Sequence, residues 1–207
     1  KDLAEAPEDK LLKLWEGLGY YNRVRNMQKA AQKIEEEYAG KFPENYEEIK
    51  ALPGIGNYTA GAISSFAYGI PKPAVDGNVL RVVSRLLASD EDIMKASVRT
   101  KIENAIEPVI PEDAASDFNQ GLIELGAIVC VPNGEAKCEI CPLTGICEAK
   151  RLGIQNELPV KKKAKARRIE ERTVLIFKDG DHVAIRKRPD KGLLAGMYEF
   201  PNLDGKL

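Results

Sequence analysis

The chain has 207 residues, of which 43% are hydrophobic and 30% charged, so it can bury the core of one good-sized domain and part of another. Its formal net charge of −1 argues against nucleic-acid binding through bulk positive charge, so any such contact must be local. No apolar run approaches the ~20 residues of a membrane span, and a protein of the cytoplasm without a membrane partner is expected.

Apolar residues recur at helical spacing over residues 3–38, which predicts two helices joined near residues 17–21. The joint carries Tyr20, followed by Arg23 and Arg25. In one interpretation the aromatic ring packs in the core and the arginines face solvent. In the other, the ring is a wedge beside a phosphate-binding rim.

The stretch FPENYEEIKALPGIGNYTAGAISSFAYG predicts a helix over residues 44–51, a tight turn over 52–56, and a second helix that begins at Asn57 or Tyr58. The turn contains Leu52, Gly54 and Gly56. Its glycines let the backbone approach an anion closely, and free amides at the start of the second helix point at that anion. The pattern indicates a helix-hairpin-helix that binds a DNA phosphate, with a plain interhelical turn as the alternative.

The stretch PAVDGNVLRVVSRLLA predicts a helix capped by Asp76. Aspartate is a favoured N-cap on structural grounds alone. The amide donors and the positive end of the helix also favour a negative charge at this position. A fixed anion at a cleft is what a developing carbocation requires.

Residues 98–128 predict two further helices, and the second, FNQGLIELGAIV, runs directly into the first cysteine. The only cysteines are Cys130, Cys138, Cys141 and Cys147, with seven, two and five residues between them. With one His and no secretory signal, a disulfide scaffold is not expected. A four-thiolate zinc site and a 4Fe-4S cluster fit this spacing equally well.

After the cysteines the composition changes, and residues 157–171 form a basic stretch without apolar periodicity, which predicts a linker. From residue 172 the pattern is typical of strands, with TVLIF and HVAIRKR joined by an Asp-Gly turn. This short region cannot bury a core of its own, so residues 172–207 are expected to be the beginning of a second domain.

Together, LPGIGNYTAGAI, PAVDGNVLRV and FNQGLIELGAIVC, in this order before the cysteine loop, resemble the helix-hairpin-helix DNA glycosylase superfamily, in particular its MutY-type adenine DNA glycosylases. The resemblance covers essentially the whole chain. It implies a mainly α, two-lobed fold over residues 1–156, with a helical barrel lobe over 1–68 and a lobe with a 4Fe-4S cluster over 69–156. It also implies that residues 172–207 begin a truncated Nudix-like α/β domain, which reads 8-oxoguanine.

The resemblance implies a bacterial monomer that acts on double-stranded DNA and removes adenine mispaired with 8-oxoguanine or guanine. Asp76 would be the aspartate that stabilises an oxocarbenium-like sugar, and Asn78 its polar partner. Gln120 would contact the flipped adenine, and Tyr20 would insert near the opposite 8-oxoguanine. Tyr58 stands where endonuclease III enzymes have a lysine nucleophile, which favours a monofunctional glycosylase.

Two departures from the family pattern qualify this resemblance. The family usually has six residues between its first two cysteines and this chain has seven, so DNA contact by that loop is not implied. The family's catalytic glutamate would precede Lys1, so the chain alone is expected not to excise adenine. An endonuclease III-like lyase and a DNA-binding module without chemistry are the competing hypotheses, and Tyr58 and the Nudix-like tail argue against the lyase.

Overall fold

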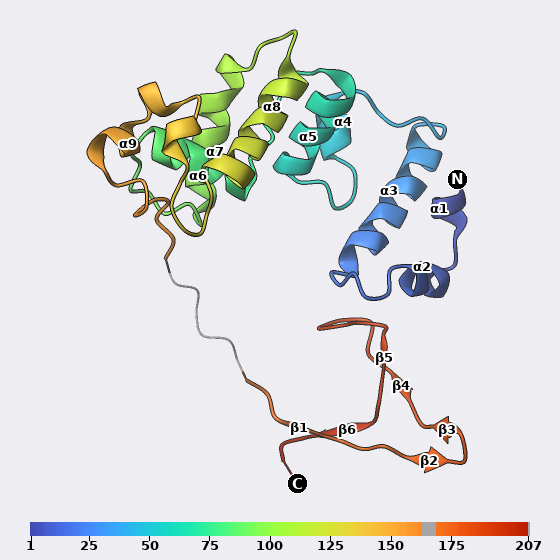
Figure 1. The fold of residues 1–207 in the computed structure, drawn as a ribbon. Helices are drawn as coiled ribbons and strands as arrows, with labels where there is room; N and C mark the ends of the chain where they lie inside the picture. Colours follow the sequence, from blue (N-terminus) through green and yellow to red (C-terminus); the bar gives the residue numbers. More distant parts are fainter. Residues whose placement is uncertain (163–168, 207) are drawn as a thin grey trace. The chain divides into compact units, whose positions relative to one another are not determined.

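The computed structural model describes residues 1–162 and 169–206, which belong to two compact units, Lys1–Lys162 and Lys163–Leu207. The first unit is helical and the second contains short antiparallel strands (Figure 1). The mainly α fold class expected from the sequence is therefore confirmed. Among the described residues, no helix has the length and apolar character that a membrane crossing requires.

The helices of the first unit are mostly short and are joined by tight turns. In its described residues they are α1 (Asp2–Glu5), α2 (Glu8–Leu14), α3 (Asn22–Glu37), α4 (Tyr46–Lys50), α5 (Asn57–Tyr68), α6 (Gly77–Leu86), α7 (Ala96–Ile106), η1 (Glu107–Val109), α8 (Ala115–Glu124), η2 (Leu125–Val129), η3 (Cys138–Ile140), η4 (Thr144–Ile146) and α9 (Glu148–Leu152).

The N-terminal region differs from the two helices predicted over residues 3–38, because α1 and α2 are separate elements before α3. Pro7 is the N-cap of α2, with φ −58° and ψ 135°. The residue before a proline is biased away from helical backbone, so α1 ends there. The α1 end packs on α3, where Gln28 Nε2 donates to Ala6 O at 2.6 Å.

The predicted helix-hairpin-helix consists of α4, the turn over residues 51–56, and α5. Asn45 caps α4 by accepting a hydrogen bond from Glu47 N at 2.9 Å. Leu52 is buried and anchors the turn. Gly54 has φ +80°, and a Cβ atom at this position would lie 2.5 Å from Asn26 Cβ, so both its conformation and the space require glycine.

The apolar core of the first unit lies around α6, which packs against α7, α8 and α9. Val79, Leu80 and Val83 of α6 join a cluster of buried residues that continues with Val75, Ile93, Val98, Ile102, Ile106, Ile110 and Ala115. The predicted helix that runs into the first cysteine is confirmed, because α8 continues through η2 to Val129 and Cys130 follows directly.

The first compact unit extends to Lys162, beyond the boundary predicted at residue 156. Leu158 is buried, and Ile93 N donates to Val160 O at 3.1 Å. These contacts join the beginning of the predicted linker to the helical unit. Residues 163–168 of that linker lie outside the described residues.

Three antiparallel strand pairs form the described part of the second unit. The predicted Asp-Gly hairpin is present, with Asp179 opposite His182 and Gly180 at φ +55°. The strands are β1 (Arg172–Val174), β2 (Lys178–Asp179), β3 (His182–Val183), β4 (Arg186–Lys187), β5 (Tyr198–Glu199) and β6 (Asn202–Asp204), paired β1 with β6, β2 with β3, and β4 with β5.

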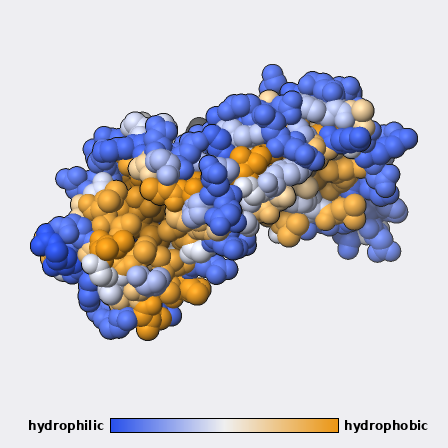
Figure 2. All heavy atoms as spheres, turned by 90° about the horizontal axis from the view of Figure 1, so that it is seen from above, coloured by the Kyte–Doolittle hydropathy of each residue, from blue (hydrophilic) through white to orange (hydrophobic). Residues whose placement is uncertain are grey.

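Large apolar side chains of the helical unit are also found at its surface, among them Leu87, Ile140 and Ile146. Figure 2, which shows the molecule from above, has apolar residues gathered toward the end of the unit that carries α6 to α9.

Candidate functional site

Asp76 is the N-cap of α6, as the sequence predicts, and both of its carboxylate oxygens are held. Oδ1 accepts hydrogen bonds from Asn78 N at 2.8 Å and Val79 N at 2.9 Å. Oδ2 accepts one from Asn78 Nδ2 at 2.8 Å. Three donors therefore orient one half-buried carboxylate at the N-terminus of a ten-residue helix.

The extended segment that leads to Asp76 is fixed by a buried amide on α8. Asn119 Oδ1 accepts from Ala74 N at 2.8 Å, and Asn119 Nδ2 donates to Lys72 O at 3.0 Å. The same Nδ2 donates to Ala115 O at 3.0 Å, so the side chain is fully used. The backbone before Asp76 cannot shift without breaking buried hydrogen bonds.

Two glycines bring the neighbouring helices to van der Waals contact with this segment. A Cβ atom at Gly61 of α5 would lie 2.0 Å from Pro73 O, and one at Gly126 would lie 2.6 Å from Asn78 Cβ. Neither position accepts a larger residue without a backbone shift. Close packing of α5 and η2 on residues 73–78 thus sets the position of Asp76.

Tyr58 is the second residue of α5 and is 40% exposed. The N-cap before it, Gly56, has extended backbone and offers no capping side chain. The first amide groups of α5 consequently have no side-chain cap, and backbone amides at a helix start can bind an anion.

Arg81 is a site residue that sequence reasoning missed. It is 4% exposed, and burial is the main cause that lowers the pKa of its guanidinium. Its Nη2 donates to Asn78 Oδ1 at 2.8 Å and Gly126 O at 2.6 Å, and its Nε donates to Cys130 O at 2.7 Å. One side chain thus connects the polar partner of Asp76 to the beginning of the cysteine loop. The only signal in the sequence is its spacing of four from Arg85 within a helix rich in valine and leucine.

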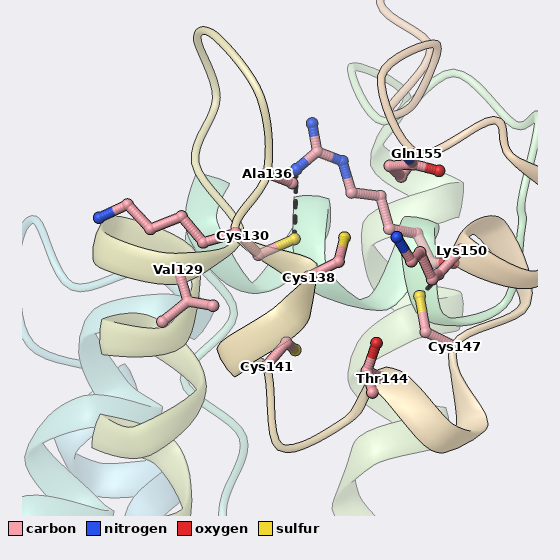
Figure 3. Close-up of a pocket in the computed structure, with 11 residues that line it drawn as sticks. Val129, Cys130, Ala136, Cys138, Cys141, Thr144, Cys147, Lys150 and Gln155 are labelled. Carbon is pink, nitrogen blue, oxygen red and sulfur yellow. Dashed lines mark hydrogen bonds between the residues drawn. The ribbon is translucent and has the colours of Figure 1, made fainter.

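The four cysteines line one small cavity between α6, the loop and α9, and all four are free and half-buried (Figure 3). Arg85 Nη1 donates to Cys130 Sγ at 3.2 Å and to Val131 O at 3.0 Å. Arg85 thus places a guanidinium beside the first of the four sulfurs. The structure therefore brings all four predicted ligands together around a common space.

The donor set of this cavity suits a thiolate-bound metal centre. Burial is the main cause that raises the pKa of the Cys138 thiol, and the nearby Lys150 acts in the opposite direction. Within residues 1–162 and 169–206, no group of three or more His, Cys, Asp or Glu side chains is already arranged to hold a metal ion. The four cysteines would be the ligands, with Arg85 as a charged neighbour.

Of the other predicted contact residues, Tyr20, Arg23 and Gln120 are exposed and Arg25 is half-buried. Tyr20 is 78% exposed at φ +47°, and Arg23 Cζ lies 4.9 Å from the centre of its ring. Arg25 Nε donates to Glu8 Oε1 at 2.7 Å, so this arginine already has an acidic partner. Gln120 Nε2, on the exposed surface of α8, donates to Ser116 Oγ at 2.8 Å.

Residues 1–108 match the family model described as HhH-GPD superfamily base excision DNA repair protein. The chain is 33% identical to an adenine DNA glycosylase of Buchnera aphidicola (subsp. Schizaphis graminum), over the whole chain and 59% of the relative. It is 32% identical to the adenine DNA glycosylase of Homo sapiens, over 98% of the chain and 45% of the relative. The chain thus spans roughly half the length of these curated relatives.

Two solved structures have a similar fold. A non-covalent endonuclease III–DNA complex superposes with a TM-score of 0.63 at 30% identity, over 74% of this chain and 70% of that chain. A thermostable thymine-DNA glycosylase superposes with a TM-score of 0.64 at 27% identity, over 73% of this chain and 69% of that chain.

Proposed function

Because this chain belongs to the HhH-GPD superfamily of base excision DNA repair proteins, we propose that the protein removes adenine mispaired with 8-oxoguanine or guanine by hydrolysing its N-glycosidic bond. The observation that carries this proposal is the Asp76 carboxylate, held by three donors at the start of α6. Adenine DNA glycosylases are among the relatives that the chain matches along its whole length.

Asp76 would act through its charge. As the bond from the sugar to adenine lengthens, positive charge develops on the sugar, and a fixed carboxylate stabilises that charge without reorganising during the reaction. Asn78 would keep the carboxylate in place through its amide, while its own oxygen is held by Arg81. Gln120 would contact the flipped adenine, and Tyr20 would insert near the opposite base.

Double-stranded DNA would be bound through its backbone at the hairpin. The turn with Leu52, Gly54 and Gly56 would place the first amides of α5 against a phosphate. Arg23 would contribute to the same contact with the DNA backbone. Among the described residues Arg23 has no acidic partner, whereas Arg25 pairs with Glu8. A phosphate-directed surface of this kind is compatible with the net charge of −1, because the contact is local.

Tyr58 would make the enzyme monofunctional, because a phenol cannot form the Schiff base with the sugar that leads to strand cleavage. We expect Tyr58→Lys to create a covalent complex with duplex DNA containing an abasic site, trapped by borohydride and detected as a shifted band on a denaturing gel. Tyr58→Arg, a cation that cannot form the imine, is the matched control. If Tyr58→Lys folds and binds DNA but no complex is trapped, Tyr58 does not occupy the nucleophile position.

The four cysteines would hold a 4Fe-4S cluster through their thiolates, and the cluster would brace the loop that Arg81 and Arg85 contact. We expect the purified protein to be brown, with broad absorbance near 400 nm and about four irons per chain. Metal analysis and the absorbance spectrum check this together. Colourless protein with one zinc per chain would contradict the cluster assignment and support the four-thiolate zinc site.

The second unit would belong to a Nudix-like domain that contacts 8-oxoguanine. This assignment is supported by the hairpin after residue 172 and by relatives whose matches extend through this region. The competing candidate, an endonuclease III-like lyase, is supported by the similarity to the endonuclease III complex. Tyr58 distinguishes the two, because the lyase requires an amine nucleophile.

A further inference from the structure

A buried carboxylate on α7 contacts the first residue of α5, outside the network around Asp76. Glu103 is 8% exposed, and its Oε2 accepts a hydrogen bond from Asn57 Nδ2 at 2.9 Å. Its other oxygen, Oε1, is buried and has no hydrogen-bond partner among the described residues. A buried carboxylate with an open oxygen is unfavourable in a site that serves packing alone, where an apolar side chain would be more stable.

The contact falls at the residue that determines how α5 begins. Asn57 is the first residue of α5 and directly precedes Tyr58. Gly56 provides no capping side chain, so the Glu103–Asn57 hydrogen bond is a side-chain restraint on the first turn of the helix. A negative charge near a helix N-terminus also interacts favourably with the helix dipole.

Helix α7 also holds the segment that leads to Asp76. Arg99, one turn before Glu103, donates from Nη1 to Val75 O at 2.6 Å, and Val75 directly precedes Asp76. Residues four apart lie on one face of a helix, so α7 touches both segments with neighbouring side chains. The close approach of Gly61 to Pro73 O also brings the two segments together.

We infer that Glu103 is a positioning residue that fixes the start of α5, and with it Tyr58, relative to the Asp76 segment held by Arg99. This inference rests on the proposed function, in which Tyr58 and Asp76 both lie beside the sugar of the target nucleotide. A displacement of about 1 Å at such a position can lower a reaction rate by about a hundredfold.

The test uses the 207-residue chain carrying Tyr58→Lys and a duplex with an abasic site, so that no base excision is needed. The introduced amine adds to the C1′ aldehyde of the open sugar, water leaves, and borohydride delivers a hydride to the imine. We expect Glu103→Ala to lower the trapping rate about tenfold or more, with duplex affinity changed less than about twofold. Glu103→Gln, which keeps an oxygen for Asn57, should restore most of the rate.

Glu91→Ala is the matched control. Glu91 lies before α7 and forms a surface ion pair with Lys101 of α7 at 2.6 Å. We expect this variant to trap at the parent rate. The inference would be overturned if Glu103→Ala traps at the parent rate. It would also be overturned if Glu103→Gln or Glu91→Ala traps as slowly as Glu103→Ala.

Hydrogen–deuterium exchange in the chain without Tyr58→Lys provides a second measurement that does not depend on chemistry. Glu103→Ala should speed exchange in the first turns of α5 and leave α6 unchanged. Exchange in α5 that stays at the parent rate would contradict the inference. If the Tyr58→Lys protein with Glu103 intact binds the duplex but traps nothing, Tyr58 does not occupy the nucleophile position, and the exchange result alone decides the role of Glu103.

Discussion

Asp76→Asn is expected to lower the rate of adenine excision by about a hundredfold or more, while binding to duplex DNA stays nearly unchanged. The amide keeps an oxygen that can accept from Asn78 N and Val79 N, so the cap of α6 survives. The negative charge is lost, and one preorganised electrostatic contact of this kind contributes about 3 kcal/mol or more to the transition state. The measurement is single-turnover excision from a duplex with adenine opposite 8-oxoguanine, by the protein extended at its N-terminus to match its relatives.

Asp92→Asn is the matched control for this variant. Asp92 is likewise an aspartate whose side chain accepts from backbone, since its Oδ1 accepts from Met94 N at 3.0 Å. It is buried and lies outside the network around Asn78 and Arg81. Its excision rate should stay within about threefold of the parent, as for substitutions away from the reacting atoms. Full excision activity in Asp76→Asn would remove Asp76 from the mechanism.

Gly61→Ala is expected to lower the free energy of unfolding more than alanine at any other described glycine, because the new Cβ atom would lie 2.0 Å from the backbone oxygen of Pro73. Such a contact cannot be relieved by a side-chain rotation, so α5 or residues 73–76 must move. Overpacking in a well-filled core costs about 1–3 kcal/mol and occasionally more. We expect the midpoint of thermal unfolding, followed by circular dichroism at 222 nm, to fall by several degrees.

Gly121→Ala provides a control with the opposite expected sign. Gly121 lies inside α8, and a methyl group added to its Cα would meet no heavy atom of another segment within 4 Å. Alanine in an exposed helix interior is more favourable than glycine by about 0.5–1 kcal/mol. An unchanged unfolding midpoint in Gly61→Ala would contradict the packing described around Pro73, and a lower midpoint in Gly121→Ala would contradict the open space around Gly121.

The features that the sequence predicts well are those determined by neighbours along the chain. Asp76 is predicted as an N-cap because aspartate before an apolar helical pattern accepts from the amides two and three residues later, and the structure has both bonds. The hairpin at Gly54 follows from the same kind of local rule. The cysteines are expected around one centre because their spacing is short.

Contacts between distant segments are not predictable in this way. Arg81 bonds to Cys130 O, and Asn119 bonds to Ala74 N, across more than forty residues in each case. No periodicity in the sequence marks such partners, because they depend on how α6 and α8 pack. The sequence assigns Leu158 to a linker for the same reason, since its burial is determined by contact with the helical unit.

Adenine release from a duplex with adenine opposite 8-oxoguanine tests the proposed function most directly, with strand cleavage measured in the same sample. The chain is assayed alone and with an N-terminal extension that matches its relatives, because alone it spans 59% of the Buchnera relative. We predict that the extended protein releases adenine and leaves an abasic site whose backbone breaks only on later treatment with alkali. Cleavage of the strand without alkali, or release of oxidised pyrimidines in place of adenine, would contradict the account.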